Sequence, residues 1–165
     1  MGSEMCIRDR SSAAKAISLK ELGSIKLDKD ETKKTLKTIP RSSVIGFIVG
    51  VLPGAGSTIA SFLAYGMERN FVNKEEKEKF GKGSVHGLAA PETANNAACS
   101  GSFVPLLTLG IPGSGTTAVM LGALLGFGIQ PGPRLYMTNP EIFWSVIMSM
   151  YVGMVILLIL NLPLI

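Results

Sequence analysis

The chain alternates between lysine-rich polar segments and long, uncharged apolar segments. Ser11 to Arg41 is polar with a weak helical repeat of apolar positions, which predicts a surface loop or an amphipathic helix. Uncharged apolar sequence runs from Ser43 to Met67 and again from Gly101 to Ile129. Glu141 to Leu160 is an unbroken apolar stretch of membrane-spanning length. The pattern predicts an all-α, polytopic integral membrane protein with helices broken by Pro and Gly, either re-entrant or discontinuous.

This pattern divides the chain into a short non-native segment, a loop and a membrane domain. Residues 1–10 lack an apolar core long enough for a signal peptide, and they resemble a tag or a sequence-assembly scar. The remainder is interpreted as a cytoplasmic loop at 11–42 and a membrane domain at 43–165. That domain comprises a broken segment at 43–67, a charged loop at 68–83, a small-residue helix with a second broken segment at 84–130, and a spanning helix at 141–162, closed by Asn161 and Pro163.

Composition and charge narrow the class of protein. Hydrophobic residues make up 47% and charged residues 17%, where soluble domains carry about 25% charged residues. Ten of the sixteen Lys and Arg lie between Arg8 and Arg41 and five between Arg69 and Lys82, mixed with acids and without interleaved aromatics. This distribution is typical of membrane-flanking segments and disfavours nucleic-acid binding. Two cysteines and one histidine indicate no disulfide framework and no metal site.

The apolar segment at 43–67 is interrupted at its centre by Pro53-Gly54-Ala55-Gly56. Proline removes a backbone donor and glycine adds backbone freedom, so a helix should break there. The segment is then either a kinked spanning helix or a hairpin of two arms, each about ten residues and about 15 Å long. Because a hairpin returns both lysine-rich segments to the cytoplasmic side, the positive-inside rule favours the hairpin.

The segment from Gly83 to Asn96 is rich in small residues and contains Pro91, which we expect in the first turn of a helix. Helical spacing then places four polar or sulfur-containing residues on one face, namely Glu92, Asn95, Asn96 and Cys99. Small residues at Ala94, Ala97 and Ala98 allow close contact between helices.

A short motif occurs twice: Leu52-Pro53-Gly54-Ala55-Gly56-Ser57-Thr58 recurs 59 residues later as Ile111-Pro112-Gly113-Ser114-Gly115-Thr116-Thr117. Paired Gly/Pro interruptions in apolar segments point to a transporter site, where broken helices meet near the middle of the bilayer. Half-helix N-termini suit an anionic substrate, and hydroxyls with freed carbonyls suit Na⁺. The candidate substrate- or ion-binding residues of the motifs are Gly54, Gly56, Ser57, Thr58, Gly113, Ser114, Gly115, Thr116 and Thr117, with Na⁺ expected at Ser57, Thr58, Thr116 and Thr117.

Other interpretations of these motifs remain open. The breaks can serve helix packing alone, and a hydroxyl after a break can simply satisfy freed backbone groups. Gly113-x-Gly115-x-x-Ala118 also matches a loose dinucleotide fingerprint, but no strand–helix–strand context surrounds it and neither copy has a phosphate-loop lysine.

Glu92, Asn95 and Asn96 complete the candidate site. An acidic residue in an otherwise uncharged, membrane-like region is a candidate proton carrier or cation ligand. The competing explanation is that Glu92 lies in the first turn of a helix, where the helix dipole favours an acid. The two asparagines either bind substrate or hydrogen-bond neighbouring helices. His86 is interpreted as an interfacial residue rather than a switch.

Three stretches resemble the large permease subunit of the tripartite tricarboxylate transporter family: GVLPGAGSTIASFLAYGMER, FGKGSVHGLAAPETANNAACSGSFVPLLTLGIPGSGTTAVMLGALL and GIQPGPRLY. The resemblance extends from about Leu19 to Ile165, and APE-x-ANN and LGIPGS are its most specific parts. It implies a multi-pass permease of the bacterial inner membrane, not an enzyme, that imports carboxylates by an ion gradient. The implied partners are a small membrane subunit and a periplasmic substrate-binding protein.

Members of that family are roughly three times longer and have two related halves, so this chain resembles an internal piece of the second half. No resident cofactor is expected, and Na⁺ or H⁺ is the expected coupling ion. Two other classes are kept as alternatives: a membrane-anchoring module whose kinks only pack helices, and a soluble nucleotide-binding enzyme.

Overall fold

The computed structural model describes residues 28–164, with side chains described to residue 160, and these residues form helices without any strand. The helices are α2 (Lys29–Val51), α3 (Gly56–Phe71), α4 (Lys74–Lys77), α5 (Val85–Gly101), α6 (Phe103–Leu109), α7 (Gly115–Gly126), α8 (Leu135–Thr138) and α9 (Pro140–Leu164). The all-α prediction is confirmed for this part of the chain. The segment interpreted as a tag or scar, 1–10, lies outside the described residues.

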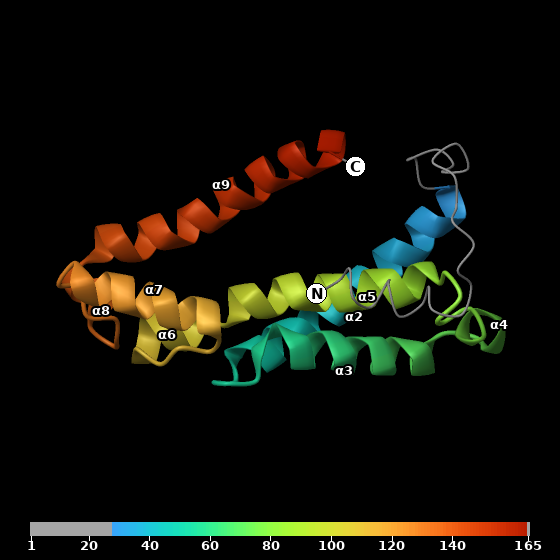
Figure 1. Cartoon of the computed structure of the whole chain (residues 1–165), viewed down its shortest axis with the longest axis horizontal. Coiled ribbons are helices and arrows are strands. Elements are labelled where there is room, and N and C mark those ends of the chain that lie inside the picture. The colour runs from blue at the N-terminus through green and yellow to red at the C-terminus, as the bar shows by residue number, and fades with distance from the viewer. Residues whose placement is uncertain (1–27, 165) are drawn as a thin grey trace.

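Helices α2, α3 and α5 form a three-helix unit, in which α5 packs against both other helices (Figure 1). Helices α2 and α5 run parallel to each other, and α3 runs antiparallel to both. Small residues set the spacing between α2 and α5. A Cβ atom added at Gly46 would lie 2.4 Å from the Ala94 carbonyl oxygen, and one at Gly50 would lie 2.3 Å from that of Ala98. Ala94 and Ala98 are buried, which confirms their predicted role in close helix contact, whereas Ala97 is only half-buried.

The helices beyond α5 form an extended arm with little contact to the three-helix unit. Helix α6 continues from the end of α5, and α9 turns back from the far end of the arm (Figure 1). Helix α9 includes the one segment of the described chain that is long and apolar enough to cross a membrane, Pro140–Leu160, and none of it is buried. The predicted spanning helix is therefore present as a helix, and it continues past Asn161 and Pro163 to Leu164.

The starts of α2 and α5 follow from their caps, and the predicted position of Pro91 is wrong. Helix α2 begins at Lys29, because Asp28 and Glu31 form a capping box, and it continues through Pro40. The described part of the segment before Arg41 is therefore helical, which agrees with the helix alternative and not with the loop. Helix α5 begins at Val85, because the Ser84 hydroxyl accepts a hydrogen bond from the Gly87 amide. Pro91 is therefore the seventh residue of α5 and not part of its first turn.

The break at Pro53–Gly56 is present, and its two arms fold back against each other as the hairpin interpretation requires. Lys34 of α2 and Glu76 of α4 form a 3.0 Å ion pair, so the two lysine-rich segments meet at one end of the unit. The helical arms are longer than the ten residues predicted, at 23 residues for α2 and 16 for α3. The uncharged part of α2, residues 42–51, is only about 15 Å long.

Candidate functional site

The first helix break is a tight turn whose backbone is open to its surroundings. Gly54 and Gly56 have φ angles of 81° and 69°, a conformation that side chains with a Cβ rarely adopt. A Cβ added at either residue would meet nothing within 4 Å. Glycine is therefore required at both positions by the backbone conformation, since there is space for a larger side chain.

Helix α3 begins at this turn without a side-chain cap. Ala55 precedes its first residue and carries no hydrogen-bond acceptor on its side chain. The first N–H groups of a helix have no partner within the helix, and the helix dipole adds partial positive charge there. Ser57 is half-buried and Thr58 exposed in this first turn. The N-terminus of α3 is thus suited to a carboxylate.

The second break differs, because the N-terminus of α7 has its own cap. The Ser114 hydroxyl accepts a hydrogen bond from the Thr117 amide at 3.3 Å, and the Thr117 hydroxyl accepts one from the Ser114 amide at 2.8 Å. Thr117 is 2% exposed and also donates its hydroxyl to the Ser114 carbonyl. Two of the predicted ligand residues therefore form a capping box, whereas Gly115 and Thr116 are exposed.

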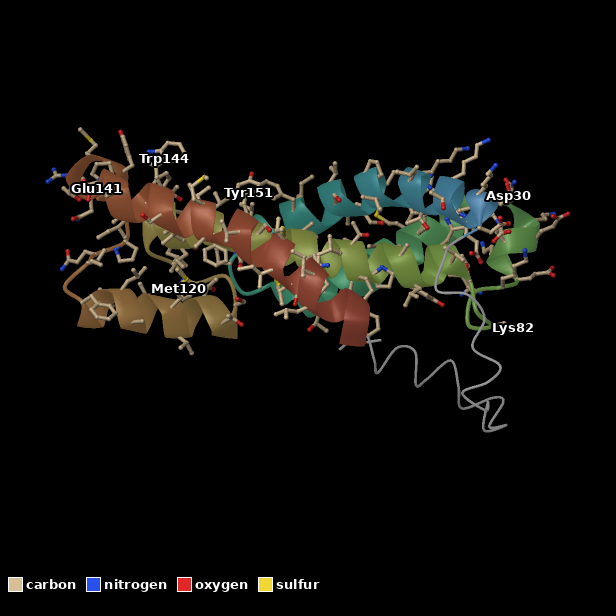
Figure 2. All side chains as sticks on the ribbon, turned by 90° about the horizontal axis from the view of Figure 1, so that it is seen from above. Asp30, Lys82, Met120, Glu141, Trp144 and Tyr151 are labelled. Carbon is tan, nitrogen blue, oxygen red and sulfur yellow. The ribbon has the colours of Figure 1, made fainter. Side chains whose placement is uncertain are left out.

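The second break packs against the end of α2 that leads into the first break. Gly113 is buried, and a Cβ added there would lie 3.0 Å from the Ser102 Cβ and 3.4 Å from the Gly50 carbonyl oxygen. Gly50 is two residues before Leu52, the first residue of the repeated motif. The turn between α2 and α3 and the start of α7, the helix of Met120, lie at the same end of the three-helix unit (Figures 1 and 2).

The remaining candidates lie in the middle of α5. Glu92 and Asn95 are half-buried and Asn96 is exposed. Glu92 and Asn96 lie on the face of α5 opposite Ala94, which contacts α2. Glu92 is the eighth residue of α5, so the explanation that the dipole of a first turn favours it is wrong. Glu92 is an acid without that structural reason, and it is only partly covered by the described residues, so it stays a candidate ion-binding group.

A buried polar cluster joins the three helices at the end opposite the breaks. Glu68 of α3 is 2% exposed, and its carboxylate accepts hydrogen bonds from Arg41 at 2.7 Å and from Thr38 at 2.9 Å. The His86 Nδ1 atom of α5 lies 3.1 Å from the same carboxylate oxygen and 2.7 Å from the Thr38 hydroxyl. These four residues, hereafter the Glu68 cluster, connect one buried carboxylate to α2 and α5.

The sequence interpretation missed the Glu68 cluster. His86 was interpreted as an interfacial residue, and nothing in the sequence indicated that it is buried against Thr38 and Glu68. Arg41 and Glu68 were grouped with exposed flanking charges. One usable signal was present: Ala60, Ala64 and Glu68 follow each other at intervals of four, and all three are buried on one face of α3.

Comparison with known proteins decides the family. The sequence model of the tripartite tricarboxylate transporter TctA family matches residues 3–165. The chain belongs to this family. The matched family is one of transporters, and membership in it implies a membrane location.

Two curated relatives come from Agrobacterium vitis. An "uncharacterized 52.8 kDa protein in TAR-I ttuC′ 3′ region" is 43% identical over 149 residues, which are 90% of this chain and 29% of the relative. An "uncharacterized protein in TAR-II ttuC′ 3′ region" is 50% identical over 120 residues, which are 73% of this chain and 49% of the relative. The chain thus spans less than half the length of these relatives. No solved structure matches it.

Proposed function

We propose that the chain is part of the permease subunit of a binding-protein-dependent secondary transporter that imports tricarboxylates or related carboxylates. TctA membership supports the transporter class. The site geometry supports an anionic substrate, because the open N-terminus of α3 and the second break lie at the same end of the three-helix unit. A periplasmic binding protein would deliver the substrate, and a small membrane subunit would complete the assembly in the bacterial inner membrane.

The mechanism that fits this geometry is alternating access around the two breaks. The N–H groups at the start of α3 hold the substrate carboxylate, and the exposed Thr58 and Thr116 with nearby carbonyls offer oxygen ligands to Na⁺. The uncharged part of α2 is about half as long as the hydrocarbon core is thick, so an α2–α3 hairpin entering from the lysine-rich end brings the turn near the bilayer centre. Na⁺ or H⁺ supplies the driving force.

Replacing Gly115 tests the site without disturbing the fold. In Gly115→Leu, introduced in the full-length permease, we expect carboxylate uptake to fall about tenfold or more, because a bulky side chain then covers the exposed start of α7. The position has open space around it, and leucine is a better helix former than glycine. Uptake of radiolabelled carboxylate into proteoliposomes, with membrane insertion checked separately, is the measurement.

Gly122→Leu is the matched control, since Gly122 lies on the same helix and also has nothing within 4 Å of an added Cβ. We expect it to transport normally. Equal uptake by the two variants would refute the assignment of the second break to the substrate site.

Glu92→Gln distinguishes the two coupling ions. If Glu92 carries the coupled proton, the variant should lose the pH dependence of uptake, because the amide does not titrate. If Na⁺ drives transport, the pH profile should stay unchanged while uptake keeps its dependence on Na⁺. The measurement is initial uptake at a series of pH values, with and without Na⁺.

A structural membrane module is the second candidate function. The observation in its favour is the capping box at Ser114 and Thr117, which uses two predicted ligand side chains to stabilise α7. Under this alternative, Gly115→Leu and Gly122→Leu transport equally well.

A further inference from the structure

A basic cavity opens at the end of the three-helix unit that is distant from the two breaks. Its volume is about 390 Å³, and it lies between α2, the segment that joins α3 to α4, and the start of α5. Four cationic side chains of α2 line it: Lys33, Lys34, Lys37 and Arg41. Figure 2 shows this end of the molecule between the labelled residues Asp30 and Lys82.

The cavity has positive charge that its own acids do not neutralise. Its four cations face two lining carboxylates, Asp30 and Glu76. Lys34 pairs with Glu76 at 3.0 Å, and Arg41 pairs at 2.7 Å with Glu68. Lys33 and Lys37 form no ion pair within the described part of the chain. These two lysines, one helical turn apart on the same face of α2, are available to an external anion.

The other charged groups hold the cavity in shape. Hydrogen bonds from Lys79 and Lys34 lower the pKa of Glu76, and the bond to Glu76 raises the pKa of Lys34. This pair therefore stays ionised at neutral pH and ties α2 to α4. Arg41 is fixed in turn by Glu68.

Two apolar side chains, Phe71 and Val72, line the basic cavity, and others are exposed elsewhere on α2. Phe71 lines it and is 59% exposed, with its ring centre 5.3 Å from the Arg41 guanidinium. Along α2, Leu36 and Val44 are 64% and 59% exposed. A bound molecule would thus meet cations inside the cavity and hydrocarbon immediately beside it.

We propose that this cavity binds the phosphate headgroup of an anionic membrane lipid. Lys33 and Lys37 contact the phosphate, and the acyl chains lie along Phe71 and the exposed aliphatic residues of α2. Basic pockets between helices on the cytoplasmic side of a membrane recognise such headgroups. The lysine content of both flanking segments favours that side under the positive-inside rule. The proposal requires a membrane location and is independent of which substrate is transported.

Lipid binding to the purified full-length permease tests the proposal. Native mass spectrometry in detergent at low ionic strength would follow the binding of added phosphatidylglycerol. We expect the double variant Lys33→Gln/Lys37→Gln to bind about 30-fold more weakly, because two cations near the phosphate are lost. The matched control is Lys77→Gln/Lys82→Gln, which removes two exposed lysines from α4 and the loop after it, and it should bind as the unmodified protein does.

Each other result overturns the proposal. Equal binding by both double variants and the unmodified protein would mean that the cavity is not the site, and equal losses would mean a diffuse surface attraction. Glycerol phosphate has the same anionic group without acyl chains, so effective competition by it would indicate a soluble phosphate ligand instead. The variants' thermal unfolding without added lipid checks that the fold is intact. None of these measurements uses carboxylate uptake, so failure of the lipid proposal can be distinguished from failure of the transport proposal.

Discussion

Glu68→Ala is expected to lower the free energy of unfolding of the permease by about 3 kcal/mol. Glu68 is 2% exposed and accepts hydrogen bonds from Arg41 and Thr38, and it also contacts the buried His86. Its loss leaves a cation and two polar groups without their common partner. The value is at the lower end for a broken buried pair, because the Arg41 side chain is 39% exposed and can be partly hydrated.

The measurement is equilibrium unfolding of the full-length permease in mixed micelles. Glu75→Ala is the control, since Glu75 is an exposed acid of α4, and its replacement should change the stability by less than about 0.5 kcal/mol. Glu68→Gln keeps one hydrogen-bond acceptor, so its free energy of unfolding should lie between those of Glu68→Ala and Glu75→Ala. If Glu68→Ala were as stable as Glu75→Ala, the Glu68 cluster would not hold the three helices together.

Gly46→Ala is expected to destabilise the protein by about 1–3 kcal/mol even though alanine is the better helix former. The added Cβ would lie 2.4 Å from the carbonyl oxygen and 2.6 Å from the Cα of Ala94. Both atoms belong to the backbone of α5, so no side-chain rotation relieves the overlap. The methyl group therefore forces α2 and α5 apart along their shared contact.

Gly66→Ala is the matched control because Gly66 lies inside α3, is exposed and has nothing within 4 Å of an added Cβ. It should stabilise the protein by up to about 1 kcal/mol, the ordinary gain in helix propensity. The two substitutions are chemically identical and should have effects of opposite sign in the same unfolding experiment. Stabilisation by both would show that α2 and α5 are not in close contact.

These two predictions concern the scaffold that supports the candidate site. Gly46 and Gly50 bring α2 against Ala94 and Ala98 of α5, the helix that also carries Glu92. Moving α5 away from α2 would displace both Glu92 and the break at Gly113, which packs against the end of α2. We therefore expect Gly46→Ala to reduce uptake as well as stability.

Much of the secondary structure was predictable because its causes are local. Proline lacks a backbone donor, and Gly54, Gly56 and Gly110 adopt positive φ angles, so the two breaks follow from a few neighbouring residues. The apolar helix α9 follows equally from its composition. One error concerned a proline: Ser84 caps α5, so Pro91 is accommodated inside this helix and not in its first turn. The cap at Asp28 also decided that the segment before Arg41 is helical, which the sequence had left open.

The sequence by itself determined where the helices break and which segments are apolar. It also determined which family the motifs at both breaks resemble. All three depend on residues that lie close together in the chain. Only the tertiary structure decided that Glu68 is buried with partners 18 to 30 positions away in the sequence. It also decided that Gly46 and Gly50 lie against the backbone of α5, where a larger residue does not fit. It also showed that Thr117 caps α7 while the start of α3 is open. Burial and partner choice depend on how separate helices pack, which no local pattern contains.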